Sequence, residues 1–151
     1  MTPIAYFKLQ AKNLFRDYKT RTSTMDVVDG RSHYAYDAKY FDVDAIFVDF
    51  DWDEDHFSLM KAQHTIAIIA GFRKWADLTK ASVAELELAK LLFDHQDKIN
   101  AEEWAMYAHA EHDNKTTLDA ETRLEIYKQA VSRDGGPRSQ FLDYRLTSKG
   151  V

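Results

Sequence analysis

The chain has 151 residues, of which 45% are hydrophobic and 30% charged, and its formal net charge is −5. This length and apolar content are typical of one soluble domain with its own core, so we expect residues 1–151 to form a single domain. The absence of cysteine excludes thiol catalysis, disulfide bonds and cysteine-ligated zinc, and it fits the reducing cytoplasm. We find neither a signal peptide nor a run of about 20 apolar residues, so we expect no membrane association.

The first predicted element is an amphipathic helix from about Thr2 to Thr20. Thr2 followed by Pro3 is typical of an N-cap with proline at the first helical position, and apolar residues recur at helical spacing from Ile4 to Tyr18. A second stripe lies about a third of a turn away and consists of four basic residues: Lys8, Lys12, Arg16 and Lys19. We expect this stripe to face solvent or a partner.

The next segment, residues 20–53, lacks helical periodicity and is rich in aromatic and acidic residues. Asp29-Gly30 is a turn signal, and we expect an ordered, irregular insertion. Residues 42–52 fit either a strand or a short helix capped by Asp42, and the short helix is favoured. The aromatic residues of this segment are of the kind that anchor protein interfaces, and four of them are candidate partner-binding residues: Tyr34, Tyr36, Tyr40 and Trp52.

The rest of the chain predicts further helices joined by short connections. Their signals are capping residues at the start and glycine at the end. They indicate a helix from about Asp55 to Gly71, a helical turn at 75–78, helices opened by Ser82 with Glu85 and by Asn100 with Glu103, and a helix from about Asp119 to 134. The tail, residues 137–151, is expected to fold back over the core. We therefore predict an all-α protein, a compact bundle or orthogonal array of about six helices with the insertion after the first helix.

Two segments carry a resemblance to a known family. The segments are 7–14 (Phe-Lys-Leu-Gln-Ala-Lys-Asn-Leu) and 58–78, which ends in Ala-Gly-Phe-Arg-Lys-Trp-Ala-Asp-Leu. They resemble the small helical domain of bacterial glyoxalase-related proteins, and residues 20–53 interrupt the match. The chain is also similar to Bacteroidetes proteins of unknown function that share Gly-Phe-x-x-Trp and the stretch at 85–93, Glu-Leu-Glu-Leu-Ala-Lys-Leu-Leu-Phe. The resemblance implies a helical domain and no particular activity.

The acidic run at residues 42–55 admits two interpretations. Carboxylates at this density either surround a hard cation such as calcium or magnesium, or they form a solvated loop with helix caps or an internal partner for the basic stripe. The run lacks the glycine and the terminal glutamate of an EF-hand loop. The second interpretation is favoured, and no cofactor is expected.

A metal hypothesis also arises from His109, His112 and Asp113. Residues three apart share a helix face, and His-Asp is the central dipeptide of HD phosphohydrolases, which are all-α metal enzymes. Those enzymes need a further histidine upstream and a further aspartate downstream, for which this chain offers several unselective choices. An exposed polar helix end is the favoured interpretation.

The sequence contains no nucleophile elbow, phosphate loop, dinucleotide fingerprint or zincin motif. We therefore predict a non-enzymatic protein-interaction or accessory protein, with another protein as its partner and no catalytic residues. One alternative is a nucleic-acid-binding protein that uses the basic N-terminal helix, although four basic residues support only weak, salt-sensitive contact. The other alternative is a metal-dependent HD-like hydrolase.

Overall fold

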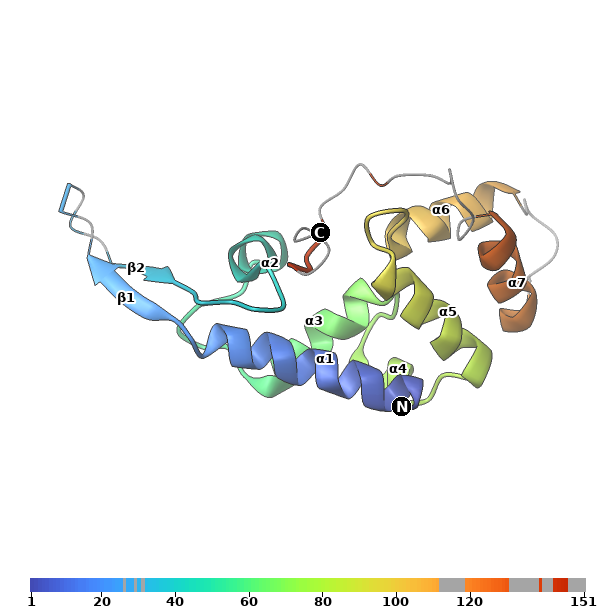
Figure 1. The fold of residues 1–151 in the computed structure, drawn as a ribbon, viewed down its shortest axis with the longest axis horizontal. Helices are drawn as coiled ribbons and strands as arrows, with labels where there is room; N and C mark the ends of the chain where they lie inside the picture. The colour runs from blue at the N-terminus through green and yellow to red at the C-terminus, as the bar shows by residue number, and fades with distance from the viewer. Residues whose placement is uncertain are drawn as a thin grey trace. The chain divides into compact units, whose positions relative to one another are not determined.

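The computed structural model describes residues 1–25, 27–28, 30, 32–111, 119–130, 139 and 143–146, with residues 32, 107–111 and 130 described by their backbone alone. Within these residues the chain forms seven α-helices and one two-stranded sheet (Figure 1). In chain order they are α1 (Pro3–Tyr18), β1 (Thr22–Met25), β2 (Ser32–Ala35), α2 (Val43–Phe50), α3 (Leu59–Ile69), α4 (Trp75–Thr79), α5 (Val83–Asp94), α6 (Ala101–Glu111) and α7 (Ala120–Ala130). No helix of this described part is both long and apolar enough to cross a membrane.

The prediction of an all-α fold is wrong, because part of the segment expected to be irregular forms an antiparallel β-hairpin. β1 and β2 pair from Thr22 with Ala35 to Met25 with Ser32. Every residue of β1 is exposed, so this strand lacks the apolar alternation by which a half-buried strand is recognised. Gly30 lies in the connection with a φ of 69°, a left-handed conformation that glycine adopts without strain.

Most of the predicted helix starts are confirmed by hydrogen bonds. The side chain of Asp42 accepts the Ala45 N–H at 3.2 Å, so residues 43–50 form a helix and not a strand. Asn100 and Glu103 bond reciprocally, side chain to backbone, at 3.1 and 2.8 Å. The corresponding caps of α1, α5 and α7 are Thr2, Ser82 and Asp119. Only α3 begins later than predicted, since its first turn is capped by Ser58.

Contacts between residues divide the chain into two compact units. The first unit consists of residues 1–7 and 66–143, and the second of residues 8–65 and 144–151. Helices α1 and α3 therefore each contribute residues to both units.

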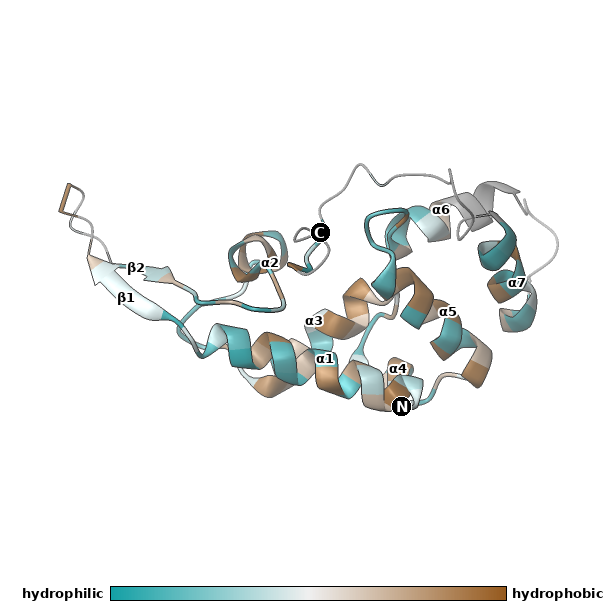
Figure 2. Cartoon of the chain, in the orientation of Figure 1, coloured by the Kyte–Doolittle hydropathy of each residue, from teal (hydrophilic) through white to brown (hydrophobic). Residues whose placement is uncertain are grey.

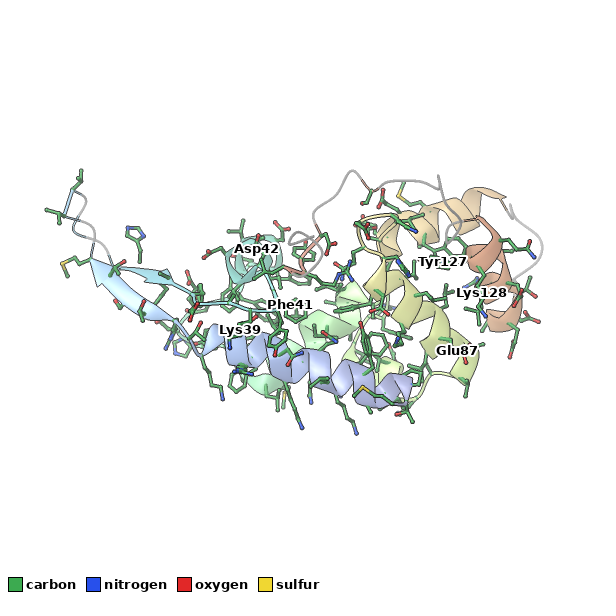
Figure 3. All side chains as sticks on the ribbon, viewed as in Figure 1. Lys39, Phe41, Asp42, Glu87, Tyr127 and Lys128 are labelled. Atoms are coloured by element: carbon green, nitrogen blue, oxygen red, sulfur yellow. The ribbon has the colours of Figure 1, made fainter. Side chains whose placement is uncertain are left out.

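The first unit has a core built mainly on α5. The rings of Trp104 on α6 and Tyr127 on α7 meet edge to face, with centroids 5.5 Å apart, and Tyr127 donates a hydrogen bond to the Leu91 carbonyl at 3.3 Å. Figure 3 labels Tyr127 on α7. Near the start of α1, Phe7 packs edge-on against Phe93 with centroids 5.8 Å apart. These aromatic contacts join α1, α6 and α7 to α5.

The second unit is organised around an aromatic cluster and one buried carboxylate. Tyr18 stacks on Phe47 of α2 at 5.6 Å, and Phe47 contacts Phe57 at 4.7 Å. Asp17 is 1% exposed, and its carboxylate accepts the backbone N–H groups of Lys39, Tyr40 and Phe41 at 3.1, 2.8 and 2.9 Å. Figure 3 labels Lys39 and Phe41 on this segment between β2 and α2. The carboxylate therefore fixes the segment against α1.

Part of the C-terminal tail also belongs to the second unit. Arg145 forms an isolated antiparallel bridge with Phe41. On either side of it, the Asp42 N–H donates to the Tyr144 carbonyl at 2.8 Å and the Leu146 N–H donates to the Tyr40 carbonyl at 3.0 Å. The described tail residues thus fold back along the segment that Asp17 holds.

Candidate functional site

Two of the predicted interface tyrosines attach the hairpin to the acidic run. The hydroxyl of Tyr34 donates to the Asp55 carboxylate, and that of Tyr36 donates to the Glu54 carboxylate. The Tyr36 ring also lies against Phe47, with centroids 6.2 Å apart. Burial and the bond to Glu54 raise the pKa of Tyr36 far above its ordinary value, and the bond to Asp55 is the main cause of a raised pKa at Tyr34. Both hydroxyls therefore remain protonated donors.

Arg21 completes this attachment from the chain just before β1. Its guanidinium carbon lies 5.0 Å from the centroid of the Tyr18 ring and 4.7 Å from that of Tyr34. The same group donates to the Glu54 carbonyl and lies 3.5 Å from the Asp55 carboxylate. We call Arg21, Tyr34 and Tyr36 the hairpin base. Their contacts fix where the hairpin leaves the unit.

The other two predicted interface residues also make internal contacts. The indole N–H of Trp52 donates to the Thr65 hydroxyl at 2.9 Å, and the Trp52 ring lies 5.9 Å from that of Phe57. Tyr40 bonds through its backbone, to Asp17 and to Leu146. The structure thus brings Tyr36 and Trp52 to one internal cluster. Direct contact of these residues with a partner stays a prediction.

The acidic run serves several internal purposes. Asp53 accepts the Asp55 N–H at 2.9 Å and lies 2.7 Å from Nδ1 of His56, and these two bonds lower its pKa. Burial and the neighbouring Asp42 and Glu54 raise the pKa of Asp44. Among the described residues, no group of three or more histidine, aspartate or glutamate side chains is placed to hold a metal ion.

Lys8, Lys12 and Arg16 lie on one exposed face of α1, and the exposed Lys19 follows its last residue; all four belong to the second unit. None of these four side chains has a hydrogen bond or an ion pair to a described residue, and only Lys19 makes a ring contact, 4.8 Å from the centroid of Phe15. Asp17, the acidic residue of this helix, is buried on another side. Figure 2 shows bands of hydrophilic colour alternating with hydrophobic ones along α1. The acidic run is therefore not the partner of the basic stripe within the described residues.

Sequence reasoning missed the apolar end of the hairpin. Met25, Val27 and Val28 are 70%, 98% and 95% exposed, and we call them the hairpin tip. Figure 1 shows the hairpin leaving the C-terminal end of α1, with its tip away from α1 and α2, and Figure 2 shows hydrophobic colour there. The available signal was the pair of valines placed next to a turn, in Asp-Val-Val-Asp-Gly.

The metal hypothesis falls outside what the structure describes. His109 lies in the part of α6, residues 107–111, that is described by its backbone alone, and His112 and Asp113 lie outside the described residues. The hydrolase alternative stays an untested prediction.

Comparison with known proteins identifies no relative: no family model, no curated protein and no solved structure matches the chain. The similarity to glyoxalase-related and Bacteroidetes proteins therefore stays a prediction.

Proposed function

We propose that this chain is a non-enzymatic protein-binding accessory protein and that the hairpin tip engages its partner. The observation that carries the proposal is the exposure of Met25, Val27 and Val28 at the end of a hairpin whose base is held by several side chains. Three neighbouring apolar side chains with this exposure are unfavourable in water unless a partner covers them.

The hairpin base makes the tip suitable for binding. A two-stranded hairpin alone is at best marginally stable in water. Here Arg21 contacts two tyrosine rings, and both Tyr34 and Tyr36 bond to carboxylates beyond the hairpin. This attachment limits the conformational entropy that the hairpin would lose on binding, so more of the burial energy appears as affinity.

The size of the tip fits a small, specific contact. Full burial of a valine or methionine side chain contributes about 1.5–3 kcal/mol, so the three residues together supply roughly 5–9 kcal/mol before the costs of association. In the sequence, Asp26 and Asp29 flank the two valines. We expect a partner with an apolar pocket rimmed by basic groups, and the two aspartates disfavour an anionic lipid surface.

Affinity capture from the source organism with tip variants tests the proposal. The test variant is V27D/V28D, and the matched control is Val83→Asp, at another exposed valine, 71% exposed at the start of α5. We expect the wild type and the control to recover the same protein and the tip variant to recover at least about tenfold less, as expected for a loss of about 1.4 kcal/mol.

Because all three substituted valines are exposed, the free energy of unfolding of each variant should lie within about 0.5 kcal/mol of the wild-type value. Urea unfolding followed by circular dichroism checks this. Equal recovery by the wild type and V27D/V28D would contradict the proposal. Recovery by neither would contradict it as well.

A further inference from the structure

We infer that the basic stripe on α1 is a second, separate binding surface that takes nucleic acid by its phosphates. This goes beyond the proposed protein contact and does not depend on the hairpin tip. The four cations follow one another at intervals of four, four and three residues, so they form one row along α1 and the residue that follows it, where the rise is about 1.5 Å per residue. The row is about 16 Å long, and all of its side chains are exposed.

The charge of the row is not neutralised by the unit that carries it. No described carboxylate forms an ion pair with Lys8, Lys12, Arg16 or Lys19. The acidic run has its own contacts with Arg21, the two tyrosines and its backbone. Neighbouring like charges that have no counter-charge repel one another, so binding of a polyanion is favourable. A nucleic acid that binds there also releases the counterions condensed on its phosphates, and this release adds to the affinity.

A membrane surface does not fit this helix. Helices that bind lipid surfaces insert an apolar face beside their basic face. In α1 the apolar residues Phe7, Ala11 and Leu14 are fully buried in the protein, so none of them is available to lipid. Leu9, at 41% exposed, is the most exposed large apolar side chain of α1, and Phe15 beside Lys19 is partly buried.

The residue types favour nucleic acid over an acidic protein. Protein interfaces are depleted in lysine and rely on buried aromatic and arginine anchors, whereas lysine and arginine together make most phosphate contacts. The stripe has three lysines and one arginine, and the one aromatic ring that they contact, Phe15, is partly buried. Contacts of this kind set no base preference, so we expect binding that is indifferent to sequence.

The experiment measures the fluorescence anisotropy of a short labelled DNA duplex and of its single strand with the full-length protein. If each of the four cations contacts one phosphate, the affinity should fall as salt rises from about 50 mM to about 200 mM. The expected fall is about 150-fold for the duplex and about 50-fold for the single strand. Unlabelled polyglutamate serves as the competitor that represents an acidic protein.

Two quadruple variants separate the stripe from the overall charge. K8Q/K12Q/R16Q/K19Q removes the stripe, and R73Q/K74Q/K80Q/R123Q removes four exposed cations of the first unit, so each changes the net charge from −5 to −9. We expect the stripe variant to lose at least about 50-fold in affinity at low salt, together with most of the salt dependence, and the control to lose less than about threefold. Glutamine keeps the helical propensity, and circular dichroism confirms that both variants fold.

Several results would overturn the inference. One is no binding of either DNA at low salt. Another is an equal loss in both variants, which would mean that overall charge and not the stripe is responsible. Displacement of the DNA by polyglutamate at the same concentration of charge would replace nucleic acid by an acidic protein as the partner. Loss of partner capture in the tip variant with unchanged DNA binding would leave both inferences standing, since they concern different surfaces.

Discussion

Substitution of Asp17 by alanine should unfold the segment that organises the second unit. The buried carboxylate accepts three backbone N–H groups, two on Oδ2 and one on Oδ1. The segment that it holds pairs with the described part of the tail and continues into α2. Removal of the carboxylate takes away three hydrogen bonds that the backbone N–H groups of residues 39–41 make to it.

The expected cost follows from these bonds. A hydrogen bond to a charged group contributes about 1.5–3 kcal/mol net, so three of them give a gross loss of at least about 4.5 kcal/mol. Release of the carboxylate from its buried position offsets part of this, and we expect Asp17→Ala to lower the free energy of unfolding by about 3 kcal/mol. Asp17→Asn keeps one acceptor oxygen, so it should cost about half as much.

Urea unfolding measures the global effect, and hydrogen exchange of the Tyr40 and Phe41 amides measures the local one. The matched control is Asp37→Ala, an exposed aspartate shortly after β2, which should change stability by less than about 0.5 kcal/mol. Two results would refute the reasoning: an Asp17→Ala variant as stable as the control, or an asparagine variant less stable than the alanine variant.

Two other predictions concern a glycine and an exposed carboxylate. Gly71 has a φ of 102°, and a Cβ there would lie 3.2 Å from the Cβ of Ala101. Gly71→Ala should therefore lower the free energy of unfolding by about 1–2 kcal/mol, which thermal unfolding measures. An increase in stability would show that neither backbone strain nor crowding matters at this position. Because the pKa of Asp53 is lowered in the folded state, its ionised form stabilises the fold above the ordinary aspartate pKa of about 3.9, and this stability is lost as the pH falls through the folded pKa. Asp53→Asn should therefore be less stable than the wild type at neutral pH and equal to it in strong acid, and a difference in the urea midpoint that persists in acid would contradict this.

The helical part of the fold was predictable because its signals are local. Asn100 and Glu103 stand three residues apart and bond to each other, and Thr2 with Pro3 begins α1 as their spacing indicates. The exposure of the basic stripe was also predictable, since the period of the helix separates it from the apolar residues. In each case the information lies within one or two turns of helix.

The hairpin and the use of its tyrosines were not predictable in this way. β1 has no buried face, so its sequence, Thr-Ser-Thr-Met, carries no alternation of apolar and polar residues. Tyr34 and Tyr36 looked like interface anchors, but their hydroxyls bond to Asp55 and Glu54, far along the chain. No spacing rule links such distant residues, and only the folded unit shows that the two tyrosines hold the hairpin base.

The measurement that tests the central proposal most directly is site-specific photo-crosslinking in the source organism. A photoreactive amino acid replaces Val27 at the hairpin tip or, as the control, Val83 at the start of α5, both of which are exposed. The proposal predicts one discrete protein adduct from position 27, lost when Val28→Asp is added, and no such adduct from position 83. Adducts of the same kind and yield from both positions, or none from position 27, would contradict it.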